Sequence, residues 1–269
     1  MVQGRLSSEV AGKYQHFPIH NWREEFYEAR KLGFDGIEWI ISDFSNPIFD
    51  KVSQKEIISL VNKTGLEISS ISLDLLMPKT LDKFSQEEIS WIFENINEIS
   101  SKVKLSRVSI PIEETCGIRD ANTLTNVQNK LIEILNKNSF KGYSLAIETD
   151  MSPEVVASFL HHKDLHNIGV LLDVGNSAAY GYKLEHYFNL LSERIFSIHI
   201  KDRPVGIGPT VPLGDGSTEF EYLSLNINKL NNLKDITLQT FKTNDNFHDD
   251  LKKAKSFIDN KVLKEFFNG

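Results

Sequence analysis

Short apolar segments alternate regularly with stretches of helical periodicity, and this alternation limits the folds that are open to the chain. The apolar segments are rich in Ile, Val and Leu. We predict strands at residues 2–6, 34–40, 66–73, 105–112, 143–149, 168–174, 195–200 and 235–241. Such alternation is typical of a parallel sheet whose strands are joined by crossover helices.

Helices are predicted between these strands, at residues 21–32, 53–64, 85–102, 121–138, 153–163, 183–193, 219–231 and 247–267. Gly33 and Gly65 end the first two helices as C-caps, and Ser152-Pro153 opens the fifth. Eight strand–helix pairs in 269 residues predict an α/β fold, a single (β/α)₈ TIM barrel domain spanning residues 1–269. A doubly wound sheet would need a Gly-rich phosphate turn after the first strand, and the sequence contains none there.

Charge and cysteine content exclude several classes of function. The chain has 30 Lys and Arg against 37 Asp and Glu, a net charge of −7, and lacks the basic runs of a general nucleic-acid binder. A single cysteine, Cys116, allows neither an intramolecular disulfide nor a cysteine-based zinc cluster. No segment has the length and apolar character of a signal peptide or membrane span. We therefore expect a cytoplasmic protein without nucleic-acid or membrane partners, and a homo-oligomer is a common state for such barrels.

Polar side chains interrupt four consecutive strands near their carboxyl ends, where the active sites of such barrels lie. They are Glu148, Asp173, His199 and Gln239. An unpaired carboxylate is costly to bury, so these groups need a common partner. Their oxygen and nitrogen donors suit one divalent metal ion, Mn²⁺, Mg²⁺, Co²⁺ or Zn²⁺. Any one of these residues considered alone could instead be a structural residue that only forms hydrogen bonds.

Several motifs extend this pattern along the chain: QGRLS (3–7), FPIHNWREEFYEARKLGFDGIEWI (17–40), AIET (146–149), LLDVGN (171–176), HIKDR (199–203) and VPLGDGSTEF (211–220). With them the chain resembles the sugar isomerases and epimerases of the xylose-isomerase-like barrel superfamily, which also includes endonuclease IV. Similarity to endonuclease IV itself is weak, because its additional histidine ligands have no clear counterparts.

The resemblance implies a catalytic mechanism with one departure from the family pattern. In the epimerase members a metal is held by Glu, Asp, His and Glu, and the two glutamates exchange the substrate proton through an enediolate. Glu148, Asp173 and His199 match, whereas Gln239 replaces the second glutamate. A glutamine cannot act as a base. If the eighth predicted strand is displaced in this alignment, Asp235 or Asp245 supplies the acid instead of Gln239. The expected activity is therefore metal-dependent isomerisation or epimerisation of a small sugar or sugar phosphate, with Glu148 as the acid/base. A lyase or dehydratase, or a carbohydrate-binding protein without turnover, is the alternative.

Five further residues are predicted to contact the substrate: Arg5, Glu38, Asn176, Lys201 and Arg203. The planar guanidinium of Arg203 suits a phosphate or carboxylate, although a surface pair with Asp202 is the simpler role. Glu38 has an equally plain alternative as a structural hydrogen-bond acceptor inside the barrel, and Asn176 as a helix cap. The Gly- and Pro-rich segment 201–218 is predicted to be a functional loop after the seventh strand.

Overall fold

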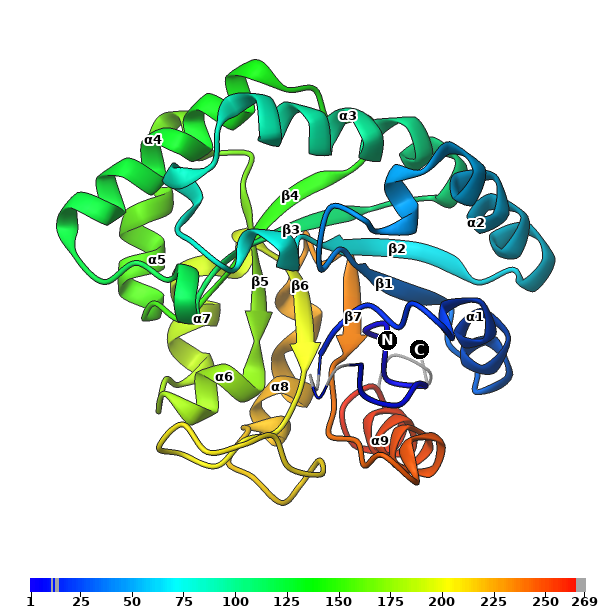
Figure 1. Cartoon of the computed structure of the whole chain (residues 1–269). Coiled ribbons are helices and arrows are strands. Elements are labelled where there is room, and N and C mark those ends of the chain that lie inside the picture. The colour runs from blue at the N-terminus through cyan, green and yellow to red at the C-terminus, as the bar shows by residue number, and fades with distance from the viewer. Residues whose placement is uncertain (11, 13–14, 265–269) are drawn as a thin grey trace.

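Seven parallel strands form a nearly closed barrel that is surrounded by helices in the computed structural model, which describes residues 1–10, 12 and 15–264 (Figure 1). The strands pair in chain order: β1 (Gly36–Ile40), β2 (Glu67–Ser72), β3 (Arg107–Ile112), β4 (Ser144–Thr149), β5 (Gly169–Asp173), β6 (Ile195–Ile200) and β7 (Asp235–Leu238). Each lies within a predicted strand. The α/β barrel expected from the sequence is therefore confirmed.

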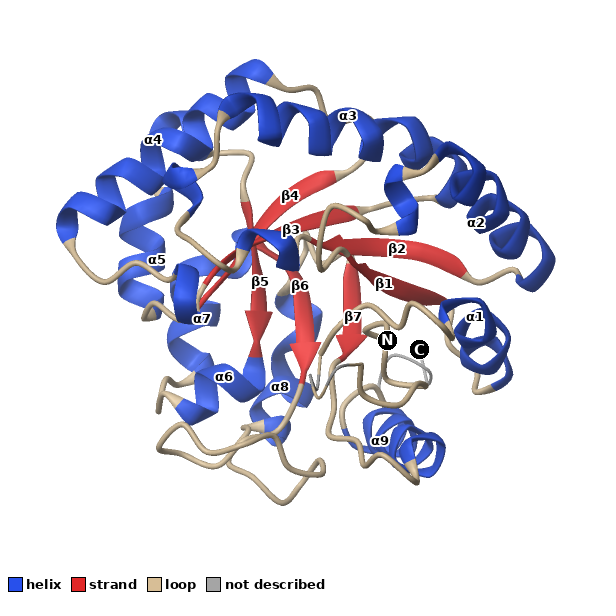
Figure 2. Cartoon of the chain, in the orientation of Figure 1, coloured by secondary structure: helices blue, strands red, loops and turns tan. Residues whose placement is uncertain are grey.

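Nine α-helices in the described residues cover the outside of the barrel (Figure 2). They are α1 (Trp22–Lys31), α2 (Lys51–Thr64), α3 (Gln86–Val103), α4 (Ala121–Lys137), α5 (Pro153–Leu160), α6 (Val174–Ala179), α7 (Leu184–Leu191), α8 (Phe220–Asn226) and α9 (Phe247–Lys261). In α3 the buried side chains recur every three or four residues and form one apolar stripe against the sheet: Ile89, Ile92, Phe93, Ile96 and Ile99.

The predicted first strand is wrong, because residues 2–6 form one isolated bridge in place of a ladder. Val2 bridges to Glu38 of β1, and its amide donates to the carbonyl of Leu238 in β7 at 3.0 Å. The amide of Gln3 donates to the Glu38 carbonyl, also at 3.0 Å. The N-terminal residues thus span the space between β7 and β1 and complete the circle with few backbone bonds.

A buried glutamate of α1 explains why this segment does not continue as a strand. The Glu25 carboxylate accepts hydrogen bonds from the amides of Gly4 at 2.9 Å and Leu6 at 3.1 Å. A backbone amide bonded to a side chain is unavailable to a β ladder. Gly4 also has a φ of +84°, a left-handed conformation that turns the chain out of the strand direction.

The helix predictions need three smaller corrections. The short helix α6 was not expected, since its residues directly follow an apolar strand; the Asp173 side chain starts it by accepting from the Asn176 amide at 2.7 Å. The helices predicted at 153–163 and 219–231 are shorter than expected. The last helix ends at Lys261, and residues 265–267 of its predicted range lie outside the described residues. Among the helices described, none is both long and apolar enough to cross a membrane.

Candidate metal centre and substrate cavity

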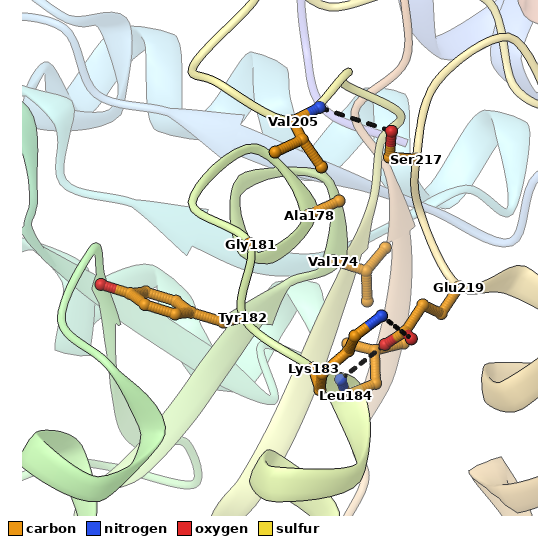
Figure 3. Close-up of a pocket in the computed structure, with 9 residues that line it drawn as sticks. All are labelled: Val174, Ala178, Gly181, Tyr182, Lys183, Leu184, Val205, Ser217 and Glu219. Atoms are coloured by element: carbon orange, nitrogen blue, oxygen red, sulfur yellow. Dashed lines mark hydrogen bonds and ion pairs between the residues drawn. The ribbon is translucent and has the colours of Figure 1, made fainter.

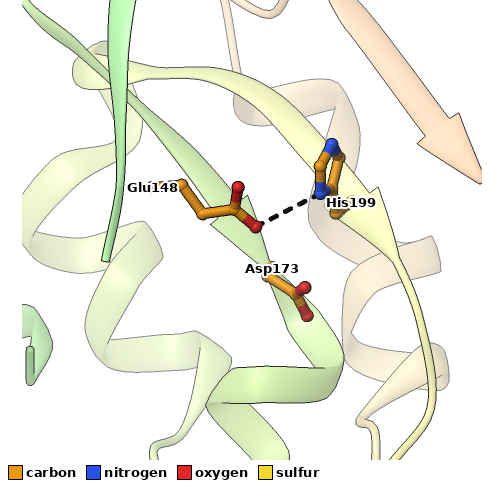
Figure 4. A group of neighbouring side chains, drawn as sticks. All are labelled: Glu148, Asp173 and His199. Carbon is orange, nitrogen blue, oxygen red and sulfur yellow. Dashed lines mark ion pairs between the residues drawn. The ribbon is translucent and has the colours of Figure 1, made fainter. Parts of the chain in front are cut away.

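Three of the predicted metal ligands meet at the carboxyl ends of neighbouring strands (Figure 4). Glu148 lies in β4, Asp173 is the last residue of β5 and His199 lies in β6, where it is the register partner of Asp173. All three are buried, and one donor atom from each lies within 4.8 Å of the others. A carboxylate, a second carboxylate and an imidazole at these separations could hold a divalent metal ion.

His199 lies between two carboxylates. Its Nδ1 atom is 3.3 Å from Oε1 of Glu148, and its Nε2 atom is 2.7 Å from Oε1 of Glu38. Burial alone would lower the pKa of His199, but the charges of Glu38 and Glu148 outweigh it and raise the pKa to about 10. This part of the barrel therefore favours positive charge, which a proton on His199 or a bound cation can supply.

Buried donor atoms without hydrogen bonds test whether these residues fit a metal. Both ring nitrogens of His199, Oδ2 of Asp173 and Oε1 of Gln239 are buried and have no hydrogen-bond partner of good geometry among the described residues. Oδ2 of Asp173 does form an ion pair with Nζ of Lys201 at 2.6 Å. Buried polar atoms are normally satisfied. The unsatisfied oxygen and nitrogen atoms fit a cation ligated by this cluster.

Gln239 directly follows β7 and presents an amide whose orientation is fixed by its neighbours. Its Nε2 donates to Oε1 of Gln15 at 2.7 Å, and Nε2 of Gln15 donates to Oδ2 of Asp74 at 3.1 Å. This chain of amides leaves the Gln239 oxygen free to accept. The alternative acids do not join the site, because Asp235 pairs with Arg107 at 3.0 Å and Asp245 is exposed.

Glu38 lies in the barrel interior and is not among the residues that line the cavity above the cluster. Its carboxylate pairs with Arg107 and accepts from Oγ of Ser70 at 3.0 Å, while its other oxygen faces His199. Burial would raise the pKa of Glu38, but the charges of His199 and Arg107 hold it well below its usual range. The structure thus favours the structural role for Glu38 over direct contact with a substrate.

A cavity of about 370 Å³ opens above the cluster and is divided by charge. Four carboxylate residues line it from the ends of β2, β3 and β4: Asp74, Glu113, Glu114 and Glu148. Cationic and amide side chains line it from the N-terminal segment and the ends of β5, β6 and β7: Arg5, Gln15, Asn176, Lys201, Arg203 and Gln239. We call these the acidic side and the basic side of the cavity.

Arg203 is directed into the basic side by Asn176. Its Nη1 donates to Oδ1 of Asn176 at 2.7 Å, and its Nε donates to the Gly208 carbonyl at 2.8 Å. The surface pair with Asp202 is not formed. Asp202 is instead buried at 1% exposure and accepts from three backbone amides of the same loop, those of Gly214, Gly216 and Thr218. Asn176 is not the helix cap named as its alternative role, because Asp173 caps α6 and the Asn176 amide donates to it at 2.7 Å.

Glu113 and Asp74 are carboxylates of the cavity that the sequence interpretation missed. Glu113 is buried, and burial together with the charge of Glu148 raises its pKa well above its usual range. Burial raises the pKa of Asp74 to about 6. Both residues directly follow predicted strands, so their position at a strand end was the available signal, although neither interrupts an apolar run as Asp173 does.

A second, much smaller cavity lies beside α6 and does not reach the cluster (Figure 3). It measures about 40 Å³, too little for a sugar. Around it, Glu219 binds Nζ of Lys183 at 3.0 Å and the amide of Leu184 at 2.9 Å, while the Val205 amide donates to Ser217 at 3.4 Å. The Glu219 contacts join the start of α8 to the start of α7, and the Val205–Ser217 bond closes loop 201–218 on itself.

Comparison with known families agrees with the fold. The model of the xylose isomerase-like TIM barrel family matches residues 26–260. The chain belongs to this family. The resemblance found in the sequence is therefore confirmed.

Individual relatives are distant. The L-ribulose-5-phosphate 3-epimerase UlaE of Shigella flexneri serotype 5b is 20% identical over 223 residues, covering 74% of this chain and 75% of the epimerase. A crystal structure of the IOLI protein with a bound zinc atom matches with a TM-score of 0.72 and 16% identity over 90% of this chain and 93% of that one. D-allulose 3-epimerase from Methylomonas sp. matches with a TM-score of 0.69 and 14% identity over 89% and 91% of the two chains.

Proposed function

We propose that the protein is a divalent metal-dependent isomerase or epimerase that acts on a small sugar or sugar phosphate through an enediolate. The observation that carries this proposal is the buried cluster of Glu148, Asp173 and His199 beneath a cavity with an acidic and a basic side. The sugar epimerases among its relatives support the substrate class.

Glu148, Asp173, His199 and the amide oxygen of Gln239 would hold the metal. When bound, a divalent ion there supplies Lewis-acid polarisation of a substrate carbonyl and a neighbouring hydroxyl. Glu148 is the base that removes the proton from the carbon beside that carbonyl, since it is the carboxylate of the cluster that also lines the cavity. Gln239 contributes no proton transfer.

The basic side is suited to holding an anionic end of the substrate. Arg5 from the N-terminal segment converges there with Lys201 and Arg203 from loop 201–218. Guanidinium groups bind phosphate through paired hydrogen bonds. This arrangement favours a sugar phosphate over a neutral sugar.

The test is solvent deuterium exchange with the protein stripped by a chelator and then reloaded separately with Mn²⁺, Co²⁺, Mg²⁺ or Zn²⁺. L-ribulose 5-phosphate and D-allulose serve as probes. We expect deuterium at the carbon beside the carbonyl only with reloaded protein, and a loss of about 1,000-fold or more in Glu148→Gln. Exchange that is equal with and without metal, or unchanged in Glu148→Gln, would contradict the proposal.

A dehydratase or other lyase is the second candidate because Gln239 removes the second base that epimerisation uses. A dehydratase would begin with the same proton abstraction as the isomerase. Its product would differ, because the substrate loses a hydroxyl group as water. Mass spectrometry of the reactions repeated in ordinary water separates the two, since isomerisation leaves the mass of the probe unchanged and dehydration lowers it by one water.

A further inference from the structure

Glu113 is a buried acid of the cavity for which the proposed function has no role so far. It is 9% exposed and lines the same cavity as Glu148. Among the described residues no cation lies within ion-pairing distance of it. Its one side-chain hydrogen bond is a neutral one, accepted by Oε2 from Nδ2 of Asn176 at 3.1 Å.

Strand register places Glu113 on the same wall as Glu148. Pro111 of β3 is the register partner of Glu148 in β4, and both line the cavity. Side chains two residues apart along an extended segment face the same side, about 7 Å apart, so Glu113 lies nearer the mouth than Pro111. Glu113 thus stands above and beside Glu148, on the acidic side.

The neighbours of Glu113 keep nearby cations away from it. Lys201 is engaged by Asp173 at 2.6 Å, and Arg203 is engaged by the oxygen of Asn176 at 2.7 Å. Asn176 therefore presents its NH₂ group to Glu113 and its oxygen to Arg203. Burial and the charge of Glu148 raise the pKa of Glu113, which suits a carboxylic acid that donates a proton.

We propose that Glu113 is a second catalytic residue, which transfers protons to and from the substrate oxygens while Glu148 transfers the proton on carbon. This inference rests on the proposed function. Glu113 does not restore the second carbon base that Gln239 lacks; it adds a carboxylic acid from the loop after β3 that acts on the substrate oxygens.

The proton transfers balance for a ketose and its aldose. Glu148 takes the proton from C1, the C–H electron pair forms the C1=C2 bond, and the carbonyl π pair takes the proton of Glu113 at O2. Glu113, now a carboxylate, takes the proton from O1; the pair of that O–H bond forms C1=O, and the C1=C2 pair takes the proton of Glu148 at C2. Both acids return to their starting states. Because Glu148 alone moves the carbon proton, that proton leaves and returns on one face of the substrate, which yields aldose–ketose isomerisation.

The test compares wild type, Glu113→Gln, Glu148→Gln and the exposed control Glu94→Gln, all loaded with Mn²⁺, with L-ribulose 5-phosphate and D-allulose in D₂O. Wild type and Glu94→Gln should exchange the carbon-bound proton and form the aldose. Glu148→Gln should lose both activities. Glu113→Gln should lose aldose formation by about 100-fold or more but retain most of the exchange, because Glu148 can still form the enediolate and return deuterium to C1, whereas moving a proton from O1 to O2 requires Glu113.

Each other result has a definite meaning. Aldose formation at the wild-type rate in Glu113→Gln would overturn this inference and leave the proposed function intact, as would a loss of exchange as large as the loss of product. A wild-type protein that exchanges neither probe would overturn the proposed function and the inference with it. Glu113→Gln keeps the shape of the side chain; if it melts below wild type, Glu113→Asp is the second variant, and it should recover part of the aldose formation.

Discussion

The charge and orientation of the His199 ring depend on the charged side chains packed around it inside the barrel. The imidazole lies between Glu148, which faces the cavity, and Glu38, which pairs with the fully buried Arg107. Metal-binding histidines commonly donate their second ring N–H to a carboxylate, which fixes the ring orientation. Glu38 is placed to do this for His199.

Replacing Glu38 by Gln should weaken metal binding by about 10- to 100-fold, because the ring of His199 loses its charged partner. Mn²⁺ affinity measured by competition with a chelator tests this. Ser70→Ala is the matched control, since Ser70 binds the oxygen of Glu38 that does not face His199. Equal Mn²⁺ affinity in Glu38→Gln and Ser70→Ala would contradict the role of Glu38.

Asp74 gives a prediction for the pH dependence of stability. Burial raises its pKa to about 6, with Ser72 and Gln15 partly opposing the shift. A raised carboxyl pKa contributes stability that is full below about pH 4 and is lost as the pH rises through about 6. On going from about pH 4.5 to about pH 7.5, Asp74→Asn should therefore gain about 1–2 kcal/mol in unfolding free energy relative to wild type, an amount reduced because Asp74 is partly exposed.

Urea unfolding of the chelator-treated protein at the two pH values measures this difference. Asp245→Asn, at an exposed site, serves as the control and should show no such gain. The same relative stability of Asp74→Asn at both pH values would show that Asp74 ionises normally in the folded protein.

The candidate ligands Glu148, Asp173 and His199 could be selected from the sequence because each interrupts an apolar strand near its end. Glu113 and Asp74 escaped this selection, since they begin the loops after β3 and β2 and interrupt no apolar run. The ion pairs of Glu38 with Arg107 and His199 depend on side-chain packing inside the barrel, which the sequence pattern does not predict.

Loop 201–218 is the element that brings the basic side of the cavity together. Asp202 acts as its internal anchor, accepting from the amides of Gly214 at 2.8 Å and of Gly216 and Thr218 at 3.0 Å. Hydrogen bonds to a charged acceptor are stronger than neutral ones. Arg203, the next residue, depends on this anchor for its place in the cavity.

Asp202→Asn should loosen the loop, because an amide cannot accept from all three N–H groups with the strength of a carboxylate. We expect hydrogen exchange of residues 204–218 to accelerate about tenfold. Mass spectrometry of the exchanged peptides measures this. Asp215→Asn, an exposed change in the same loop, should leave the rate unchanged; equal acceleration in both variants would contradict the anchor.

At this scale the sequence predicted all seven strands of the sheet, since each lies in a short segment rich in Ile, Val and Leu. The N-terminal segment was predicted as an eighth strand because it also begins with apolar residues. Its amides are taken by Glu25, a residue of the following helix, and such a tertiary contact overrides a weak local preference. The short helix α6 was missed for a related reason, since its start depends on the cap supplied by Asp173.

Over the whole molecule, closure of the barrel assembles the site from distant parts of the chain. Gln239 meets Gln15 across 224 residues of sequence, and Arg107 meets Asp235 across 128. The fold class follows from the alternation of strands and helices, and with it the end of the barrel that carries the site. The division of the cavity into acidic and basic sides appears only after closure, because each side draws on residues from separate strands.

The metal content of protein purified without chelators tests the central claim most directly. We predict about one divalent ion per chain by mass spectrometry in wild type and in the exposed control His248→Ala, and a loss of most of it in His199→Ala. Wild-type protein that lacks metal and also fails to bind added Mn²⁺, Co²⁺, Mg²⁺ and Zn²⁺ would contradict the account, as would full metal content in His199→Ala.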